Sequence, residues 1–204
     1  PRTLDDQVIK SRLASNCKQF CEGIVLMVEP KRVKELKSLI RSRDRILVLD
    51  GAMGTSIQSI ELTPDDFGGV DYEGCNEYLC VTRPDVIENI HKDFLVAGAD
   101  IIETNSFGST SVVLAEYGLG NHAPHLNREA ALIARRAADE ASSSNKIRFV
   151  AGSMGPTTKT ISVTGGISFD ELSLSYYEQA LGLIEGGVDV LLLETSQDMI
   201  NLSL

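Results

Sequence analysis

Four short apolar runs, each ending on polar or glycine-rich residues, constrain the fold of this chain more than any other feature. The runs lie at 46–55, 99–108, 148–156 and 187–198, and amphipathic stretches of helical period separate them. Parallel strands are buried on both faces, so they read as continuous Val, Ile and Leu runs rather than as alternating ones. The order of strand, polar tip, helix and strand predicts stacked βα units on a parallel sheet.

The apolar runs and the residues between them give expected bounds for each element. We expect strands at Ile46–Asp50, Asp100–Asn105, Ile147–Ala151 and Val188–Glu194. We expect helices at 30–43, from Thr82 as N-cap to Gly98, at Arg128–Ser142 with Asn127 as cap, and from a Ser168–Glu171 capping box to Gly186. The segment Gly51–Arg83 shows no clear periodicity, and such long loops in compact domains are usually functional or mobile.

Length and charge restrict the class of protein. A chain of 204 residues with 43% apolar residues can bury the core of one ordinary domain. Its net charge of −10 argues against nucleic-acid and membrane partners, since both need basic patches. The opening residues 1–10 are polar, and no apolar run approaches the ~20 residues of a membrane span. Four irregularly spaced cysteines form no disulfide framework, and we expect a cytoplasmic protein.

Three of the predicted strands end on an acid: Asp50, Glu103 and Glu194. In a parallel sheet the chemistry lies at the carboxyl ends of the strands. A buried acid is costly unless it is paired with a ligand cation, a metal, or a neighbouring Arg or Lys. Asp50 could also cap its own turn, and Glu194 could form an internal salt bridge. Because three separate strands show the same pattern, a shared pocket is the favoured interpretation.

Several common sites have no support in the sequence. There is no Gly-Lys-Ser/Thr phosphate loop, no GxGxxG after the first strand and no GxSxG. A zinc site can be drawn from Cys75, Cys80, His122 and His125, but the spacing matches no structural-zinc motif. We expect the three histidines to be exposed loop or helix residues.

Four longer segments carry a family resemblance: ILVLDGAMGTSIQ, NEYLCVTRPDVIENIHKDFLVAGADIIETNSFGST, FVAGSMGPTTKT and ISFDELSLSYYEQALGLIEGGVDVLLLET. Over about residues 44–201 they closely resemble the homocysteine S-methyltransferases, and among these the homocysteine-binding domain of the cobalamin-dependent, methionine synthase type. The resemblance implies a (β/α)8 TIM barrel that transfers a methyl group to the sulfur of homocysteine. In the complete enzyme, zinc held by three cysteine thiolates would activate the thiol, and cobalamin would carry the methyl group from methyltetrahydrofolate.

Residue by residue, the resemblance implies a substrate-binding role for seven positions and a catalytic role for none in this chain. Glu194 would hold the ammonium group of homocysteine, with Asp50 nearby. The backbone amides of Gly51 and Ala52 would receive the carboxylate. The pocket would also be lined by Thr104, Asn105 and Ser153.

The family zinc cysteines would lie beyond Leu204, so we expect no metal ligands here and no tight binding of zinc or cobalamin by this chain alone. Residues 1–43 would form a partly helical extension, and residues 44–204 the first four βα units of the barrel. The partners would be homocysteine, the remaining barrel half, and cobalamin and folate domains. The isolated chain is expected to have little activity. Two alternatives stay open: a non-catalytic half-barrel that binds an amino acid or self-assembles, and a betaine-dependent or other cobalamin-free homocysteine methyltransferase.

Overall fold

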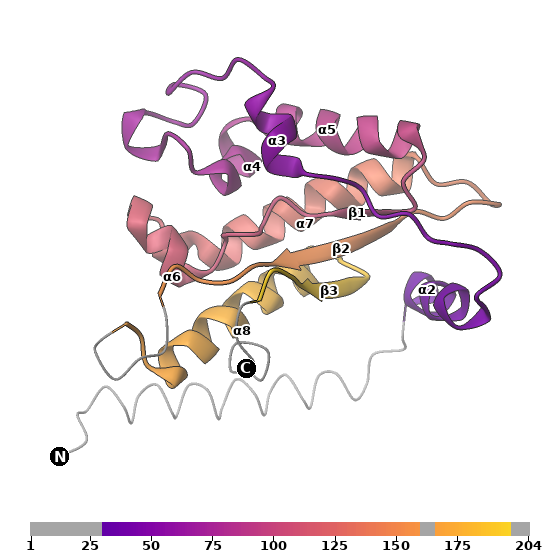
Figure 1. Ribbon diagram of the computed structural model, residues 1–204. Helices are drawn as coiled ribbons and strands as arrows, with labels where there is room; N and C mark the ends of the chain where they lie inside the picture. The colour runs from indigo at the N-terminus through magenta and orange to yellow at the C-terminus, as the bar shows by residue number, and fades with distance from the viewer. Residues whose placement is uncertain (1–29, 160–165, 197–204) are drawn as a thin grey trace.

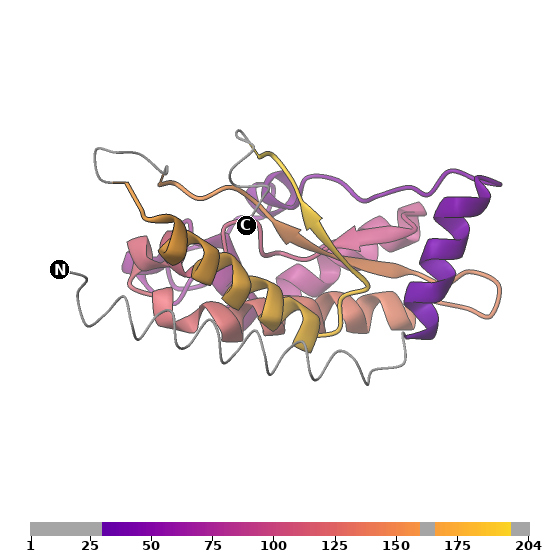
Figure 2. The same ribbon diagram turned by 90° about the horizontal axis from the view of Figure 1, so that it is seen from below.

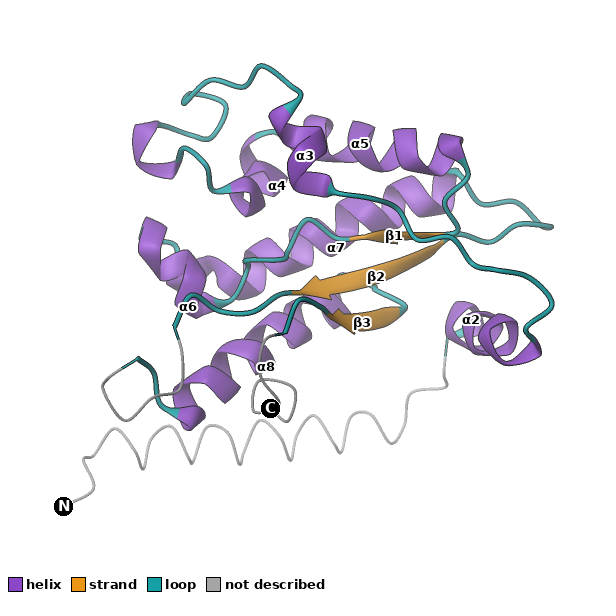
Figure 3. Ribbon diagram, in the orientation of Figure 1, coloured by secondary structure: helices purple, strands orange, loops and turns teal. Residues whose placement is uncertain are grey.

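The computed structural model describes residues 30–159 and 166–196, and these form a mixed α/β fold around a small parallel sheet (Figures 1 and 3). The sheet has the order β1-β2-β3, with β1 at Ile101–Glu103, β2 at Phe149–Met154 and β3 at Val190–Leu193. Both strand pairs are parallel, and the register aligns Glu103 with Ala151 and Ser153 with Leu192. The long helices are α5 (Pro84–Ala97), α7 (Ala123–Glu140) and α8 (Phe169–Glu185), so strands and helices alternate as predicted.

The first predicted strand, Ile46–Asp50, is wrong as a regular strand. It runs beside β1 with a single bridge between Leu49 and Ile101. Side chains take ladder donors at both ends of this segment: the Asp100 carboxylate accepts the Val48 N–H at 3.1 Å, and the Asp50 carboxylate accepts the Glu103 N–H at 3.0 Å. The other three strands are confirmed with shifted bounds. β2 extends to Met154, so Ser153 lies on a strand rather than in the following loop.

Helices α5, α7 and α8 lie on the same side of the sheet (Figure 2). Ile102 and Val150 face them and pack with Leu95, Ala134 and Ala137. Because successive side chains on a strand point to opposite faces, Glu103 and Ser153 point to the other side. In the described ranges no helix covers that side, and it is there that the strand-end polar groups gather.

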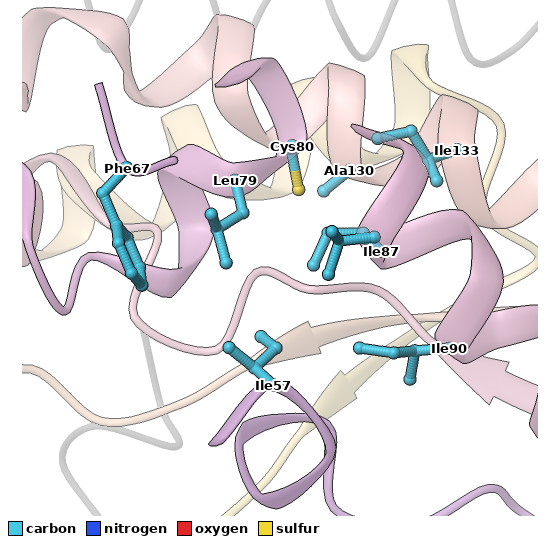
Figure 4. Packing of buried hydrophobic residues seen from close by; sticks show 9 residues of the cluster. Ile57, Phe67, Leu79, Cys80, Ile87, Ile90, Ala130 and Ile133 are labelled. Atoms are coloured by element: carbon cyan, nitrogen blue, oxygen red, sulfur yellow. The ribbon is translucent and has the colours of Figure 1, made fainter. Parts of the chain in front are cut away.

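The segment Gly51–Arg83 is built of short helices rather than loop alone. These are α3 (Met53–Gln58), the 3-10 helices η1 (Val70–Tyr72) and η2 (Asn76–Tyr78), and α4 (Leu79–Thr82). Their apolar side chains Ile57, Phe67 and Leu79 pack against α5 and α7 (Figure 4). After β1 the chain forms α6 (Ser111–Leu114) and the 3-10 helices η3 (Ala115–Tyr117) and η4 (Gly120–His122). This packing holds the long segment against the carboxyl ends of the strands.

Two of the predicted helix starts are wrong and one is confirmed. Helix α7 begins at Ala123, and Asn127 is buried inside it, where its amide donates to the carbonyls of Ser109 and Ala123 at 2.7 Å each. The N-cap of α5 is Arg83 instead of Thr82. The Ser168–Glu171 capping box is present, with Glu171 N–H donating to Ser168 Oγ at 3.2 Å.

Helices α7 and α8 approach closely because α8 presents glycines to α7. A Cβ atom at Gly186 would lie 2.4 Å from the Cβ of Ala131, and one at Gly182 would lie 2.6 Å from the Pro124 carbonyl oxygen. Both distances are too short for a real side chain. The two glycines and the alanine-rich face of α7 therefore set the spacing of this helix pair.

Two similar sequences precede strands β1 and β3 and make equivalent contacts: Gly98-Ala99-Asp100 and Gly187-Val188-Asp189. Each aspartate is buried, each accepts a backbone N–H from the neighbouring strand segment, and each is paired with arginine. Helix α2 (Lys31–Ser42) lies beside this end of the sheet (Figure 1), and its Arg32 bonds Asp189. The prediction of a helix near 30–43 that could cover this end is thus confirmed, although Ile40 is 59% exposed.

The expectation of exposed histidines is wrong for His91, which is fully buried on α5. His122 and His125 are exposed, and His125 lies on α7 rather than in a loop. Cys17 and Cys21 lie outside the described residues. No helix in the described part of the chain is long and apolar enough to cross a membrane.

Candidate functional site

A polar pocket of about 460 Å³ lies at the carboxyl ends of the strands. The tip after 46–50, the ends of β1, β2 and β3, and helix η2 all contribute to its wall. All seven residues to which we assigned a substrate-binding role line it: Asp50, Gly51, Ala52, Thr104, Asn105, Ser153 and Glu194. Glu103 lines it as well. The arrangement of βα units brings together residues that are up to 144 positions apart.

Asp50 is fixed by the backbone of the neighbouring strand. Both of its carboxylate oxygens accept the Glu103 N–H, at 3.1 and 3.0 Å. Burial raises the pKa of Asp50 to about 7, against the lowering effect of this hydrogen bond, and the charge of Glu194 raises it further. Asp50 and Glu194 therefore act on each other across one pocket, as a shared site requires.

Glu103 and Glu194 form the second part of the acidic wall. Burial raises the pKa of Glu103 to about 7, and the charges of Glu194 and Asp50 add to the effect. Glu194 accepts a short hydrogen bond from the Ser153 hydroxyl, at 2.5 Å. Three carboxyl groups thus share one cavity, and a backbone donor holds Asp50 while a hydroxyl donor holds Glu194.

Among the residues that the structure describes, none places a positive charge in the pocket to balance these acids. No Lys, Arg or His lines it, and none of the ion pairs in residues 30–159 and 166–196 involves Asp50, Glu103 or Glu194. Closely spaced carboxylates without a cation repel one another. A ligand with an ammonium group would relieve this repulsion through charge-assisted hydrogen bonds.

The pocket also offers backbone donors. Gly51 and Ala52 are exposed residues at the pocket, and no acceptor in the described residues takes a hydrogen bond from either N–H group. Free N–H groups in a glycine-containing turn can bind a carboxylate. One cavity therefore presents acceptors for an ammonium group and donors for a carboxylate, the two ends of an amino acid.

Buried hydroxyls fix the floor of the pocket. Thr104 Oγ1 lies 2.6 Å from Ser106 Oγ and accepts the Ser153 N–H at 3.0 Å. Ser106 Oγ donates to the Ser153 carbonyl at 2.7 Å, and Gln179 of α8 donates to the Ser106 carbonyl at 2.8 Å. These bonds tie β1 to β2 directly beneath Glu194, so Ser153 presents its hydroxyl in one orientation.

Sequence analysis missed Glu77, which lines the same pocket from η2. Its Oε1 accepts the Gly108 N–H at 2.8 Å, and burial raises its pKa. The neighbouring Asn76 carbonyl accepts the side-chain amide of Asn105 at 2.7 Å. Each contact joins residues about thirty positions apart, across the predicted helix that ends at Gly98, and Glu77 itself lies in the aperiodic segment Gly51–Arg83, so no local signal marked them. Phe107, 42% exposed, also lines the pocket.

The described residues do not fit a zinc site. No group of three or more His, Cys, Asp or Glu side chains lies close enough to hold a metal ion in that part of the chain. Cys75 and Cys80 are buried free thiols, and burial raises the pKa of each to about 12. A thiol with such a pKa stays protonated, whereas zinc binds thiolate.

Comparison with known proteins agrees with this geometry. The profile of the homocysteine S-methyltransferase family matches residues 47–204. Methionine synthases of Mycobacterium tuberculosis and Mycobacterium leprae are each 46% identical over 158 residues, which cover 78% of this chain and 13% of either protein. The chain thus spans a small part of the length of these relatives.

Solved structures share the fold. The homocysteine methyltransferase MmuM from Escherichia coli matches in its oxidized form with a TM-score of 0.65 and 24% identity, over 81% of this chain and 58% of that chain. Its metallated form matches with a TM-score of 0.64 and 23% identity, over 79% and 58%. At this identity the likeness establishes the fold.

Proposed function

This chain belongs to the homocysteine S-methyltransferase family, and we propose that its pocket binds the amino-acid end of homocysteine for methyl transfer to the sulfur, which forms methionine. The observation that carries this proposal is that one cavity holds both kinds of group. Three carboxylates, with no cation among the described lining residues, share it with free backbone N–H groups. An amino acid with an ammonium and a carboxylate group complements both.

Each lining residue then has a role in binding. Glu194 and Asp50 hold the ammonium group, and the amides of Gly51 and Ala52 receive the carboxylate. Ser153 orients Glu194 through its 2.5 Å hydrogen bond, and Thr104 and Asn105 complete the wall. The chemical contribution of this chain is to bind and orient the substrate so that its sulfur has one position. We assign no catalytic residue to it.

We propose further that residues 44–204 are the amino-terminal part of a (β/α)8 barrel in a larger cytoplasmic enzyme, and residues 1–43 an extension. The helix-free side of the sheet and the greater length of the relatives support this. The rest of the barrel would supply zinc ligands, and cobalamin and folate domains the methyl donor. Because the described residues do not fit zinc, no step in our proposal passes through a metal.

A second candidate is a half-barrel that assembles with another copy. The exposed apolar residues on the edge strand β3 favour it, with Val190 41% and Leu193 47% exposed. Open apolar edges of this kind tend to pair with other strands. Size-exclusion chromatography separates the candidates, since a well-behaved monomer of this chain would argue against edge pairing.

The substitution Glu194→Gln tests the binding role. It keeps an acceptor for Ser153 but removes the charge, and a hydrogen bond to a charged group contributes about 1.5–3 kcal/mol. We therefore expect the dissociation constant for homocysteine, measured by calorimetry on the complete polypeptide, to rise roughly 10- to 100-fold. Glu61→Gln, an exposed acid outside the pocket, is the matched control and should bind normally. An unchanged affinity in Glu194→Gln would remove the proposed role.

A further inference from the structure

Glu103 stands where a bound ammonium group would be within reach, yet the proposed function has given it no role. It ends β1, it lines the pocket, and its side chain points to the face of the sheet opposite Ile102, because successive side chains on a strand alternate. Its own backbone N–H holds Asp50 in place. Its carboxyl group therefore lies beside the two acids to which ammonium binding is assigned.

The contact between Glu103 and Glu194 requires a proton. Both groups line one cavity; burial raises the pKa of Glu103, and the charge of Glu194 and a hydrogen bond between the two side chains raise it further. Two ionised carboxylates have only acceptor atoms, so one of them must carry a hydrogen to form this bond. Both oxygens of Asp50 already accept the Glu103 N–H, although burial raises its pKa to about 7 as well.

No other group among the described lining residues could neutralise the pair. The titratable groups that line the pocket are Asp50, Glu77, Glu103 and Glu194, all acids. The Glu77 carboxylate is engaged by the Gly108 N–H on the far side of the loop after β1. Until a cation enters, a shared proton is the means by which the Glu103–Glu194 pair reduces its repulsion.

We propose that Glu103 is a further substrate-binding residue, which shares a proton with Glu194 in the free pocket and accepts an N–H of the substrate ammonium group once that proton has left. The inference rests on the proposed function and extends it to the charge state of the site. On binding, the O–H bond between the two carboxyl groups breaks and its proton goes to the buffer. The ammonium group takes its place, so charge is conserved overall.

The proposal has a definite sign with pH. Protons compete with the ammonium group, so affinity should fall as the pH falls. Below the pKa of Glu103, which is about 7, release of one proton makes affinity fall roughly tenfold per pH unit. Glu103→Gln places a permanent amide donor opposite Glu194, which imitates the protonated state. Its affinity should equal that of the wild type near about pH 5 and be weaker by tenfold or more near about pH 7.

The test is calorimetry of L-methionine binding to the complete polypeptide. Methionine, the product, has the same amino-acid end but no thiol whose own proton would confuse the count. Titrations in two buffers of different ionisation enthalpy give the number of protons released. The wild type and the Glu61→Gln control should release between half a proton and one proton near about pH 7, and Glu103→Gln should release less.

The outcomes separate this proposal from the one before it. Methionine binding without proton release by the wild type, or with equal release by Glu103→Gln, would overturn the role of Glu103 and leave the substrate assignment standing. Failure of every form to bind methionine would overturn the proposed function, and this inference with it. The pKa of Asp50 is also about 7, so the proton is assigned to Glu103 by the difference between the variant and the wild type and not by the wild-type count alone. Where Glu103→Gln does not fold, Glu103→Ala takes its place in this comparison.

Discussion

Replacing Asp189 by alanine is expected to lower the free energy of unfolding by about 3–5 kcal/mol, the usual cost of removing one partner from a buried ion pair. Asp189 precedes β3 and accepts hydrogen bonds from Arg135 Nη1 at 2.7 Å, Arg32 Nε at 3.1 Å and the Val150 N–H at 2.9 Å. Arg135 is only 8% exposed. Without Asp189 its charge stays buried and poorly compensated, and Val150 loses an acceptor.

Denaturant unfolding of the wild type and the variant measures this loss. Asp139→Ala is the matched control, because Asp139 also pairs with Arg135, at 2.9 Å, but its side chain is 54% exposed. An exposed pair contributes about 0–1 kcal/mol, so the control should be close to the wild type. Equal losses in the two variants would contradict the argument, since burial would then make no difference.

Replacing His91 by leucine is expected to stabilise the protein, and more so in acid. His91 is fully buried on α5, and neither ring nitrogen has a hydrogen-bond partner among the described residues. Burial lowers its pKa to about 4, against a smaller opposite effect of Glu88. Between about pH 6.5 and pH 4 the unfolded chain therefore binds a proton at His91 and the folded chain does not. The free energy of unfolding of the wild type thus decreases as the pH is lowered through this window.

The expected change in the free energy of unfolding from His91 is about 1.4 kcal/mol per pH unit, or about 3 kcal/mol over the whole window. Asp50 and Glu103 act with the opposite sign, because their pKa values are higher in the folded than in the unfolded chain. Their contribution to stability is fully present below the pKa of the unfolded chain and is lost as the pH rises to about 7. These contributions are the same in the wild type and in His91→Leu, so they cancel in the difference between the two free energies of unfolding. Unfolding curves at about pH 7 and about pH 4.5 measure that difference, and the exposed His125→Gln is the control. A difference that does not change with pH would refute the titration of His91.

The order of the fold could be predicted because burial on both faces produces local apolar runs that the sequence shows directly. The elements that were wrong depend on contacts between distant residues. The segment 46–50 fails as a regular strand because the side chains of Asp100 and Asp50 take the Val48 and Glu103 N–H groups, contacts across 52 and 53 positions. The start of α7 was placed too late because GLGNHAP reads as a loop, although Pro124 in the first turn is a helix-start signal.

The pocket was predictable for the residues that end strands, since parallel strands bring their carboxyl ends together. This reasoning reached Asp50, Glu103 and Glu194. It could not reach Glu77, whose place depends on the folding of Gly51–Arg83 and on a bond to Gly108. It also wrongly predicted that His91 is exposed, because the sequence of a helix does not show how deeply its residues are buried by the rest of the fold.

The two ends of the strands have different functions: the amino ends stabilise the fold, and the carboxyl ends form the pocket. Acids at the amino ends, Asp100 and Asp189, are neutralised by arginines, whereas the acids at the carboxyl ends have no counterion among the described residues. Thermal stability and ligand choice thus depend on different residues at opposite ends of β1 and β3. Laboratory evolution could change the ligand by substituting residues at the carboxyl ends of the strands, while the ion pairs at the amino ends continue to stabilise the fold.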